Sequence, residues 1–318
     1  MCVSAMMDDE IKKLEREYEA TVGWVEFEEI FERRIHSDIK ILKDIELQIE
    51  NSSAPQAARI RPLIAEYRKI KSAELEQEIF KQKMRLGNAE RALKTKPTKK
   101  AAEEQRIATN KIDAGLRRLA DIKRTEPAER DSRLYPFYFA PIVIHDGKQK
   151  KIIPARYHCR IAGKPAIIDR KLPGLFNARR DSLESYWKEL FGQHHAVIRI
   201  TSFFENVPLH KSEHRELREG EEEQNVVLHF NPKPTQPMHI ACIYSRWQSP
   251  GEHDLVSFAA ITDEPTPEVA AAGHDRTIIM LKKDNVASWL SPQSHSIEEL
   301  YRMFDDSEQP YFEYRKAA

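Results

Sequence analysis

Residues 135–154 read YPFYFAPIVIHDGKQKKIIP and predict a β-hairpin. Tyr135–Ile144 is rich in aromatic and β-branched residues, which favour strands, and Lys151–Pro154 resumes the pattern. Between them, Asp146-Gly147 is a dipeptide that suits a tight turn. The preceding chain is charged and has helical periodicity. We therefore expect a change from helices to strands near residue 133.

The chain after this hairpin is also predicted to consist mainly of strands. Apolar and β-branched runs predict further strands at residues 196–202, 226–229, 239–244, 257–262 and 277–281. Short helices are expected at residues 182–191 and 284–290. Runs of strands with few helices between them indicate an α+β fold, with a mostly antiparallel sheet or an open barrel.

The chain before the hairpin is expected to form a charged helical arm. Apolar residues recur at steps of three or four from Phe27 to Ile49, and similar stripes follow in residues 56–84 and 99–123. Turn-forming residues at 51–55 and 95–98 separate the three stripes, which favours a three-helix bundle or a coiled coil. No chemistry is expected here. A basic cluster at one tip is interpreted as a solvated face: Lys94, Lys96, Lys99 and Lys100.

These patterns divide the chain into residues 1–7, a helical insertion at 8–130, a mixed domain at 133–292 and a tail at 293–318. Lys plus Arg and Asp plus Glu both number 51, so overall charge gives no attraction to nucleic acid. The three cysteines are far apart, which disfavours a disulfide framework or a zinc site and favours a reducing cytosol. No apolar run is long enough to span a membrane, so a cytoplasmic location is expected.

Cys2 becomes the first residue if Met1 is removed. It then carries an amine and a thiol on adjacent carbons, with ordinary pKa values of about 8 and about 8.5. Such an aminothiol condenses with an aldehyde to an imine, and the thiol closes on the same carbon to give a thiazolidine. The alternative is a terminal cysteine without a role.

Four segments, together with Cys2, carry a resemblance to a known family. They read FNAR (176–179), TSFFE (201–205), ACIYSRW (241–247) and GHDRTIIML (273–281). In this order they resemble the SOS-response-associated peptidase (SRAP) family, over residues 1–4 and about 135–292. The helical arm would then be an insertion. Val3-Ser4 stands where the family usually has Gly-Arg.

The resemblance implies an activity. Members recognise abasic sites in single-stranded DNA and link the terminal Cys to the sugar aldehyde, which shields the lesion. They are also thought to remove their own first residue, and a lyase activity on the abasic site is a further expectation. No cofactor or metal is implied, and the expected partner is single-stranded DNA with abasic sites.

The resemblance also implies the site residues. The expected catalytic residues are Cys2, Asn177, Glu205 and His274, with Glu205 as proton shuttle and His274 as the acid or base that opens the sugar ring. By residue type, Arg179, Arg180 and Arg276 are expected to contact phosphate, and Tyr157 and Trp247, along with Phe204, to stack on DNA. His210 and His214 stand at a metal-like spacing but lie in a charged segment, so no metal site is predicted.

Two alternatives remain open. The first is a cysteine peptidase acting on peptides through Cys2, Glu205 and His274. The second is a non-enzymatic protein whose helical arm docks a repair or replication partner, with the mixed domain as a degenerate scaffold.

Overall fold

The computed structural model describes residues 2–7 and 10–317, with the side chains of residues 2 and 3 excepted. The chain folds into two compact units. The first joins residues 1–27, 39–48 and 129–318, and the second joins residues 28–38 and 49–128. The domain boundaries predicted from the sequence stay a prediction, because compactness alone does not identify an insertion.

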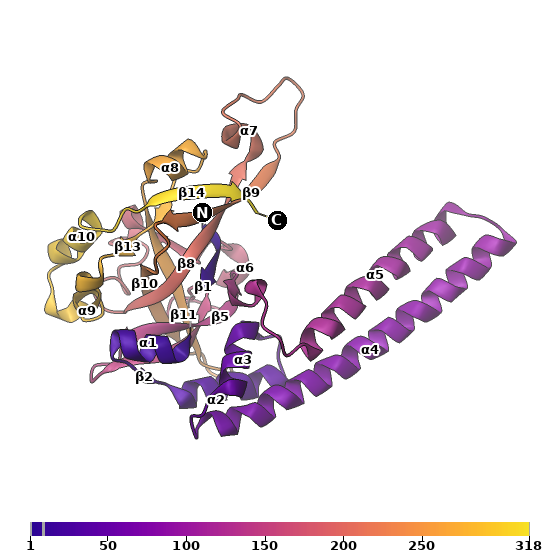
Figure 1. Ribbon diagram of the computed structural model, residues 1–318, viewed down its shortest axis with the longest axis horizontal. Helices are drawn as coiled ribbons and strands as arrows, with labels where there is room; N and C mark the ends of the chain where they lie inside the picture. The colour runs from indigo at the N-terminus through magenta and orange to yellow at the C-terminus, as the bar shows by residue number, and fades with distance from the viewer. Residues whose placement is uncertain (1, 8–9, 318) are drawn as a thin grey trace. The chain divides into compact units, whose positions relative to one another are not determined.

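The first unit is built around a closed β-barrel (Figure 1). Strand β8 pairs with β10 and β5, β10 pairs with β11, and β6 joins β5 to β11, which completes the ring. These strands are β5 (Tyr138–His145), β6 (Lys150–Tyr157), β8 (His195–Pro208), β10 (Met238–Trp247) and β11 (Leu255–Asp263). The pairings are antiparallel except β6 with β11. The α+β fold predicted from the sequence is confirmed. The sequence pattern indicates a mostly antiparallel sheet or an open barrel, and the structure has a closed barrel.

Alternating side chains of the barrel strands point inward and make an apolar core that includes Ile198, Ile200, Ile240 and Phe258. Burial of these side chains is the main stabilising contribution.

Strand β8 is long enough to extend beyond the barrel within the same sheet. Its C-terminal half lies between β1 (Cys2–Met7) and β9 (Asn225–Lys233), and β9 also pairs with β14 (Tyr311–Lys316). Shorter strands extend the edges: β2 (Thr21–Val22), β3 (Lys40–Ile41), β4 (Arg133–Leu134), β7 (Asn177–Arg179), β12 (Thr277–Ile278) and β13 (Met280–Leu281). The N-terminal strand is thus held in the sheet.

Short helices of the first unit connect these strands. They are α1 (Ile11–Tyr18), α6 (Ile168–Lys171), α7 (Leu209–Ser212), α8 (Pro267–Ala271), α9 (Val286–Trp289) and α10 (Ile297–Asp305). Turns of 3₁₀ helix lie at Glu129–Ser132, Arg180–Ser182, Lys283–Asn285 and Pro292–Ser294. The boundary between the two units crosses α2 (Trp24–Ile35) and α3 (Lys43–Asn51).

The second unit contains a long helical hairpin of α4 (Ala57–Thr95) and α5 (Lys99–Lys123) (Figure 1). Thr98 caps α5, since its hydroxyl accepts a hydrogen bond from the Ala101 amide at 3.1 Å. The helices pack closely at Gly115, where an added Cβ would lie 2.8 Å from Cγ1 of Ile79. No helix in the described part of the chain combines the length and hydropathy that a membrane span requires.

Two helix predictions were wrong in detail. Residues 182–191 form consecutive turns, in which Leu183, Trp187 and Leu190 are buried at a helix-like spacing. The stripe from Phe27 to Ile49 is divided between α2 and α3, because β3 intervenes and pairs with β5.

Candidate functional site

Glu205 lies in the part of β8 that runs between β1 and β9. It is opposite Cys2 on one side and Leu228 on the other. Only 1% of the Glu205 residue surface is exposed, and burial raises the pKa of its carboxyl group to about 8. The carboxyl group is therefore mostly protonated at neutral pH and can donate a proton as well as accept one.

His274 faces this carboxyl group. Its Nε2 lies 3.4 Å from Oε2 of Glu205, and burial lowers the pKa of the imidazole below its usual value. Nδ1 lies 2.8 Å from the carbonyl oxygen of Arg276 and 3.3 Å from the Arg276 amide nitrogen, and the shorter contact favours a ring proton on Nδ1. Nε2 then presents a lone pair to the protonated carboxyl group. The two groups form a buried, neutral pair that can pass a proton between them.

A turn at Gly273 positions His274 beside Glu205. Helix α8 ends at Ala271, and Gly273 adopts a φ of +91°, which allows the His274 amide to donate to the Val269 carbonyl at 3.1 Å. A Cβ on Gly273 would lie 2.7 Å from Cβ of Lys211 and 3.2 Å from Cγ1 of Val207. Both the backbone conformation and the lack of space require glycine here.

Gly273→Ala is therefore expected to lower the free energy of unfolding by about 2 kcal/mol or more and to displace His274. Gly251→Ala is the matched control, because Gly251 has a φ of +78° but no atom within 4 Å of an added Cβ. It should cost only about 1 kcal/mol, the strain of the left-handed backbone. Chemical denaturation of both variants gives the comparison, and equal losses would contradict the packing argument.

Cys2, the expected nucleophile, is described only by its backbone, and its side chain lies outside the described part of the structure. The register of β1 nevertheless places the Cys2 backbone opposite Glu205, with an irregularity between Cys2 and Ser4. Glu205 on β8 thus links three of the four predicted catalytic residues, because the Cys2 backbone lies opposite it and His274 contacts its carboxyl group.

Asn177, the fourth, lies in β7 and is buried. Its Oδ1 accepts a hydrogen bond from the Tyr157 hydroxyl at 3.3 Å. Strand β7 runs parallel to β11, with Asn177 opposite Ala260. This residue is therefore held at the barrel rather than in an exposed turn.

The two aromatic residues predicted to stack on DNA are packed in the protein interior. Tyr157 is 3% exposed and stacks on Phe258 with ring centroids 5.2 Å apart. Trp247 is 2% exposed, and its Nε1 donates to the Lys164 carbonyl at 2.6 Å. Neither ring offers a free face for a base, so their predicted role does not fit this structure.

The three predicted phosphate-binding arginines differ in environment. Arg179 is exposed and pairs with Asp181, and Arg276 follows His274 with a mostly buried side chain. Arg180 instead bridges Asp263 at 2.8 Å and Asp305 at 2.6 Å. Its charge is already balanced by these two carboxylates, so Arg180 is a poor candidate for phosphate binding.

The sequence did not single out Arg133, which lies beside β1. Its Nε donates to the Ser4 hydroxyl at 3.1 Å, and its guanidinium carbon lies 3.6 Å from the centroid of Phe204. His229 stacks on Phe204 with centroids 4.1 Å apart. Phe204, considered as a platform for a base, is thus covered. Arg133 is separated from Ser4 by 129 positions in the sequence, so no local pattern could have revealed the contact.

His210 and His214, the pair at metal-like spacing, lie in and just after α7. Nearby acidic side chains are engaged by Arg215, which pairs with Glu213 and Glu221. Among the described residues, no group of three or more His, Cys, Asp or Glu side chains is arranged to hold a metal ion.

Comparison with known protein families identifies the family of the chain. The chain matches the family model of the SOS response associated peptidase (SRAP) over residues 91–317, which is more than half of its length. No curated relative matches the chain.

Solved structures similar to the chain include a protein from Bacteroides thetaiotaomicron, at 15% identity and a TM-score of 0.46, covering 59% of this chain and 78% of that one. A second, from Bordetella bronchiseptica, has 14% identity and a TM-score of 0.45, covering 59% and 87%. A phage-related protein from the same organism has 15% identity and a TM-score of 0.43, covering 58% and 81%. On the family match, the protein belongs to the SOS response associated peptidase family and carries its peptidase-like domain.

Proposed function

We propose that the protein senses abasic sites in single-stranded DNA and joins Cys2, after loss of Met1, to the ring-opened sugar as a thiazolidine. The observation that carries the proposal is the register that sets the Cys2 backbone opposite Glu205, whose carboxyl group lies 3.4 Å from His274. Family membership supports the same activity.

The chemistry proceeds by condensation. The amine of Cys2 attacks C1 of the open-chain aldehyde and forms a carbinolamine. Loss of the hydroxyl group as water gives an iminium ion, and the thiol then adds to the same carbon while its proton returns to solvent or to a nearby base. The balance is one aminothiol plus one aldehyde giving one thiazolidine and one water, with no change of oxidation state.

The neutral pair of Glu205 and His274 suits the proton transfers in this sequence. The protonated Glu205 donates to the departing carbinolamine hydroxyl group, which a carboxylate with an ordinary pKa does not do efficiently at pH 7. The carboxylate that results accepts a proton from the thiol. His274 can relay protons between Glu205 and the sugar hydroxyl during ring opening.

DNA contacts are assigned to cations near this pair. Arg276 lies two residues after His274, Arg179 is exposed on β7, and Arg133 adjoins β1 through Ser4. Guanidinium groups bind phosphate by paired hydrogen bonds. Asn177 contributes an amide for the sugar or the Cys2 terminus.

The test is incubation with three single-stranded oligonucleotides of one sequence, carrying an abasic site, a tetrahydrofuran analogue or no lesion. A band that resists denaturation is expected with the abasic site alone, because the analogue has no aldehyde. Crosslinks to all three, or to none, would contradict the proposal. Hydrolysis of unrelated peptides without crosslinking would instead favour a cysteine peptidase.

A further inference from the structure

The hairpin of α4 and α5 concentrates positive charge near its tip. Residues 81–100 contain eight Lys and Arg residues and one Glu, a formal charge of +7. Because the whole chain has no net charge, all other residues together carry −7. The basic residues of this tip segment are Lys81, Lys83, Arg85, Arg91, Lys94, Lys96, Lys99 and Lys100.

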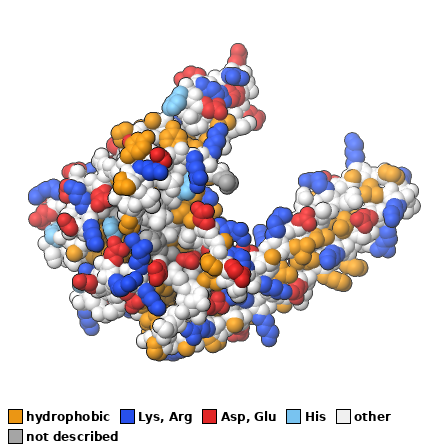
Figure 2. Space-filling model, in the orientation of Figure 1, with side chains coloured by type: hydrophobic (Ala, Val, Ile, Leu, Met, Phe, Trp, Pro, Cys, Tyr) orange, Lys and Arg blue, Asp and Glu red, His pale blue; other side chains and the backbone are white. Residues whose placement is uncertain are grey.

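These charges are mostly not neutralised within the protein. Among the described residues, the carboxylate contact found for this set joins Arg85 to Glu104. Acidic residues closer to the base of the hairpin form ion pairs with residues outside the tip segment: Glu74 pairs with Lys71, and Glu76 pairs with Lys123. Apart from Arg85 the basic side chains are exposed, and Figure 2 shows Lys and Arg gathered around the end of the hairpin. Side chains in such a cluster repel one another, so an anionic ligand relieves an unfavourable interaction.

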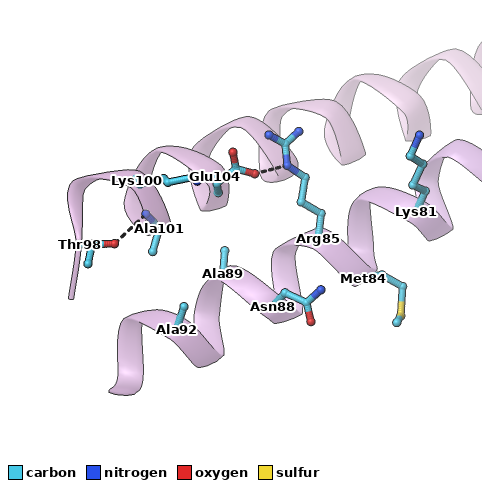
Figure 3. Close-up of a pocket in the computed structure, with 10 residues that line it drawn as sticks. All are labelled: Lys81, Met84, Arg85, Asn88, Ala89, Ala92, Thr98, Lys100, Ala101 and Glu104. Carbon is cyan, nitrogen blue, oxygen red and sulfur yellow. Dashed lines mark hydrogen bonds and ion pairs between the residues drawn. The ribbon is translucent and has the colours of Figure 1, made fainter. Parts of the chain in front are cut away.

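The basic residues also border a groove of about 550 Å³ between the two helices (Figure 3). Lys81, Arg85 and Lys100 stand along it, Glu104 lines it too and pairs with Arg85, and Asn88 and Thr98 add polar groups. Its floor is made of small or flexible apolar side chains, namely Met84, Ala89, Ala92 and Ala101. A cationic rim with a shallow apolar floor suits an extended chain of phosphates and sugars.

Helix dipoles do not account for this preference. The C-terminus of α4 and the N-terminus of α5 meet at the tip, so their opposite partial charges offset each other. The lysine and arginine side chains therefore decide the sign of the local field.

We infer that the tip segment is a second, sequence-independent nucleic-acid binding surface that contacts the phosphate backbone. It holds the protein on DNA whether or not a lesion is present. The neutral composition of the whole chain conceals it, because the compensating acidic residues lie elsewhere. This surface is separate from the site of the proposed crosslinking chemistry and does not depend on it.

The experiment uses the full chain with Cys2→Ala, which removes covalent attachment, and an undamaged, fluorescently labelled single-stranded oligonucleotide. Anisotropy titrations over a series of salt concentrations give both the affinity and its salt dependence. In the test variant Lys94, Lys96, Lys99 and Lys100 are replaced by Gln. A matched control replaces the exposed Lys12, Lys148, Lys171 and Lys188 by Gln, which changes the net charge equally. A third variant carries Arg at the four tip positions.

The tip variant should bind about tenfold more weakly or worse, and its plot of log affinity against log salt should flatten by up to about 3 units. The control and the Arg variant should keep the parent's affinity and slope. Equal losses in the tip variant and the control would overturn the inference, because net charge alone would then explain binding. Unchanged binding by the tip variant, or binding to phosphatidylserine vesicles but not to the oligonucleotide, would overturn it too.

Discussion

Cys2→Ala is expected to reduce the denaturation-resistant crosslink to abasic DNA to background. The thiazolidine needs an amine and a thiol on one residue, and alanine supplies only the amine. The two buried cysteines cannot replace it, because burial raises the pKa of the Cys159 thiol to about 12 and that of Cys242 still further. The yield is measured on a denaturing gel at fixed protein and DNA concentrations.

Cys2→Ser separates the two halves of the reaction. The serine variant keeps an amine that condenses with the aldehyde, but its imine hydrolyses during denaturation. A crosslink should therefore appear only after reduction with borohydride. Cys159→Ser is the control and should crosslink as the parent protein does. A stable crosslink formed by Cys2→Ala without reduction would contradict the aminothiol mechanism.

Glu205→Gln is expected to slow crosslinking by about 10²–10⁴-fold, the usual contribution of a positioned acid or base. The amide has nearly the same shape as the protonated carboxyl group but cannot donate its proton to a leaving hydroxyl group. Binding of undamaged DNA should change little. A single-turnover time course gives the rate, and an unchanged rate would exclude Glu205 as proton donor.

The same variant should alter stability in a defined direction. The folded-state pKa of Glu205 is about 8, above its ordinary value of 4.5, so the unfolded chain releases this proton more readily. The contribution of Glu205 to stability is therefore full below about pH 4.5 and is lost as the pH rises towards 8, at up to about 1.4 kcal/mol per pH unit. Glu205→Gln should remove this slope and be the more stable protein at pH 8.

Glu252→Gln is the matched control, because Glu252 is exposed in a loop, and it should keep the slope of the parent protein. Urea unfolding at a series of pH values supplies the comparison. A parental slope in Glu205→Gln would mean that Glu205 titrates normally.

Local patterns predicted most of the sheet but not its closure. The strand signals at residues 196–202 and 239–244 were correct, whereas β1 was missed, since Cys2–Met7 has no clear alternation and its partner lies some 200 positions later. Helix α10 had a usable signal. Ser296 and Glu299 form a capping box, and this motif is readable from sequence.

In the site, too, local sequence patterns predicted some features, whereas others depend on residues far apart in the chain. Glu205 and His274 were found through motifs, and the structure brings them together. Tyr157, Trp247 and Arg180 were assigned to DNA by residue type alone. Their surroundings depend on contacts with distant residues, such as the pairing of Arg180 with Asp263 and Asp305 across 83 and 125 positions. Composition does not distinguish a buried aromatic ring or a paired arginine from an exposed one.

The most direct test of the covalent mechanism is the intact mass of the purified protein before and after exposure to an abasic oligonucleotide, followed by peptide mapping. The aminothiol mechanism predicts a protein that lacks Met1 and then gains the mass of the oligonucleotide less one water, with the adduct on the peptide that begins at Cys2. An adduct on another residue, or on a chain that retains Met1, would contradict it.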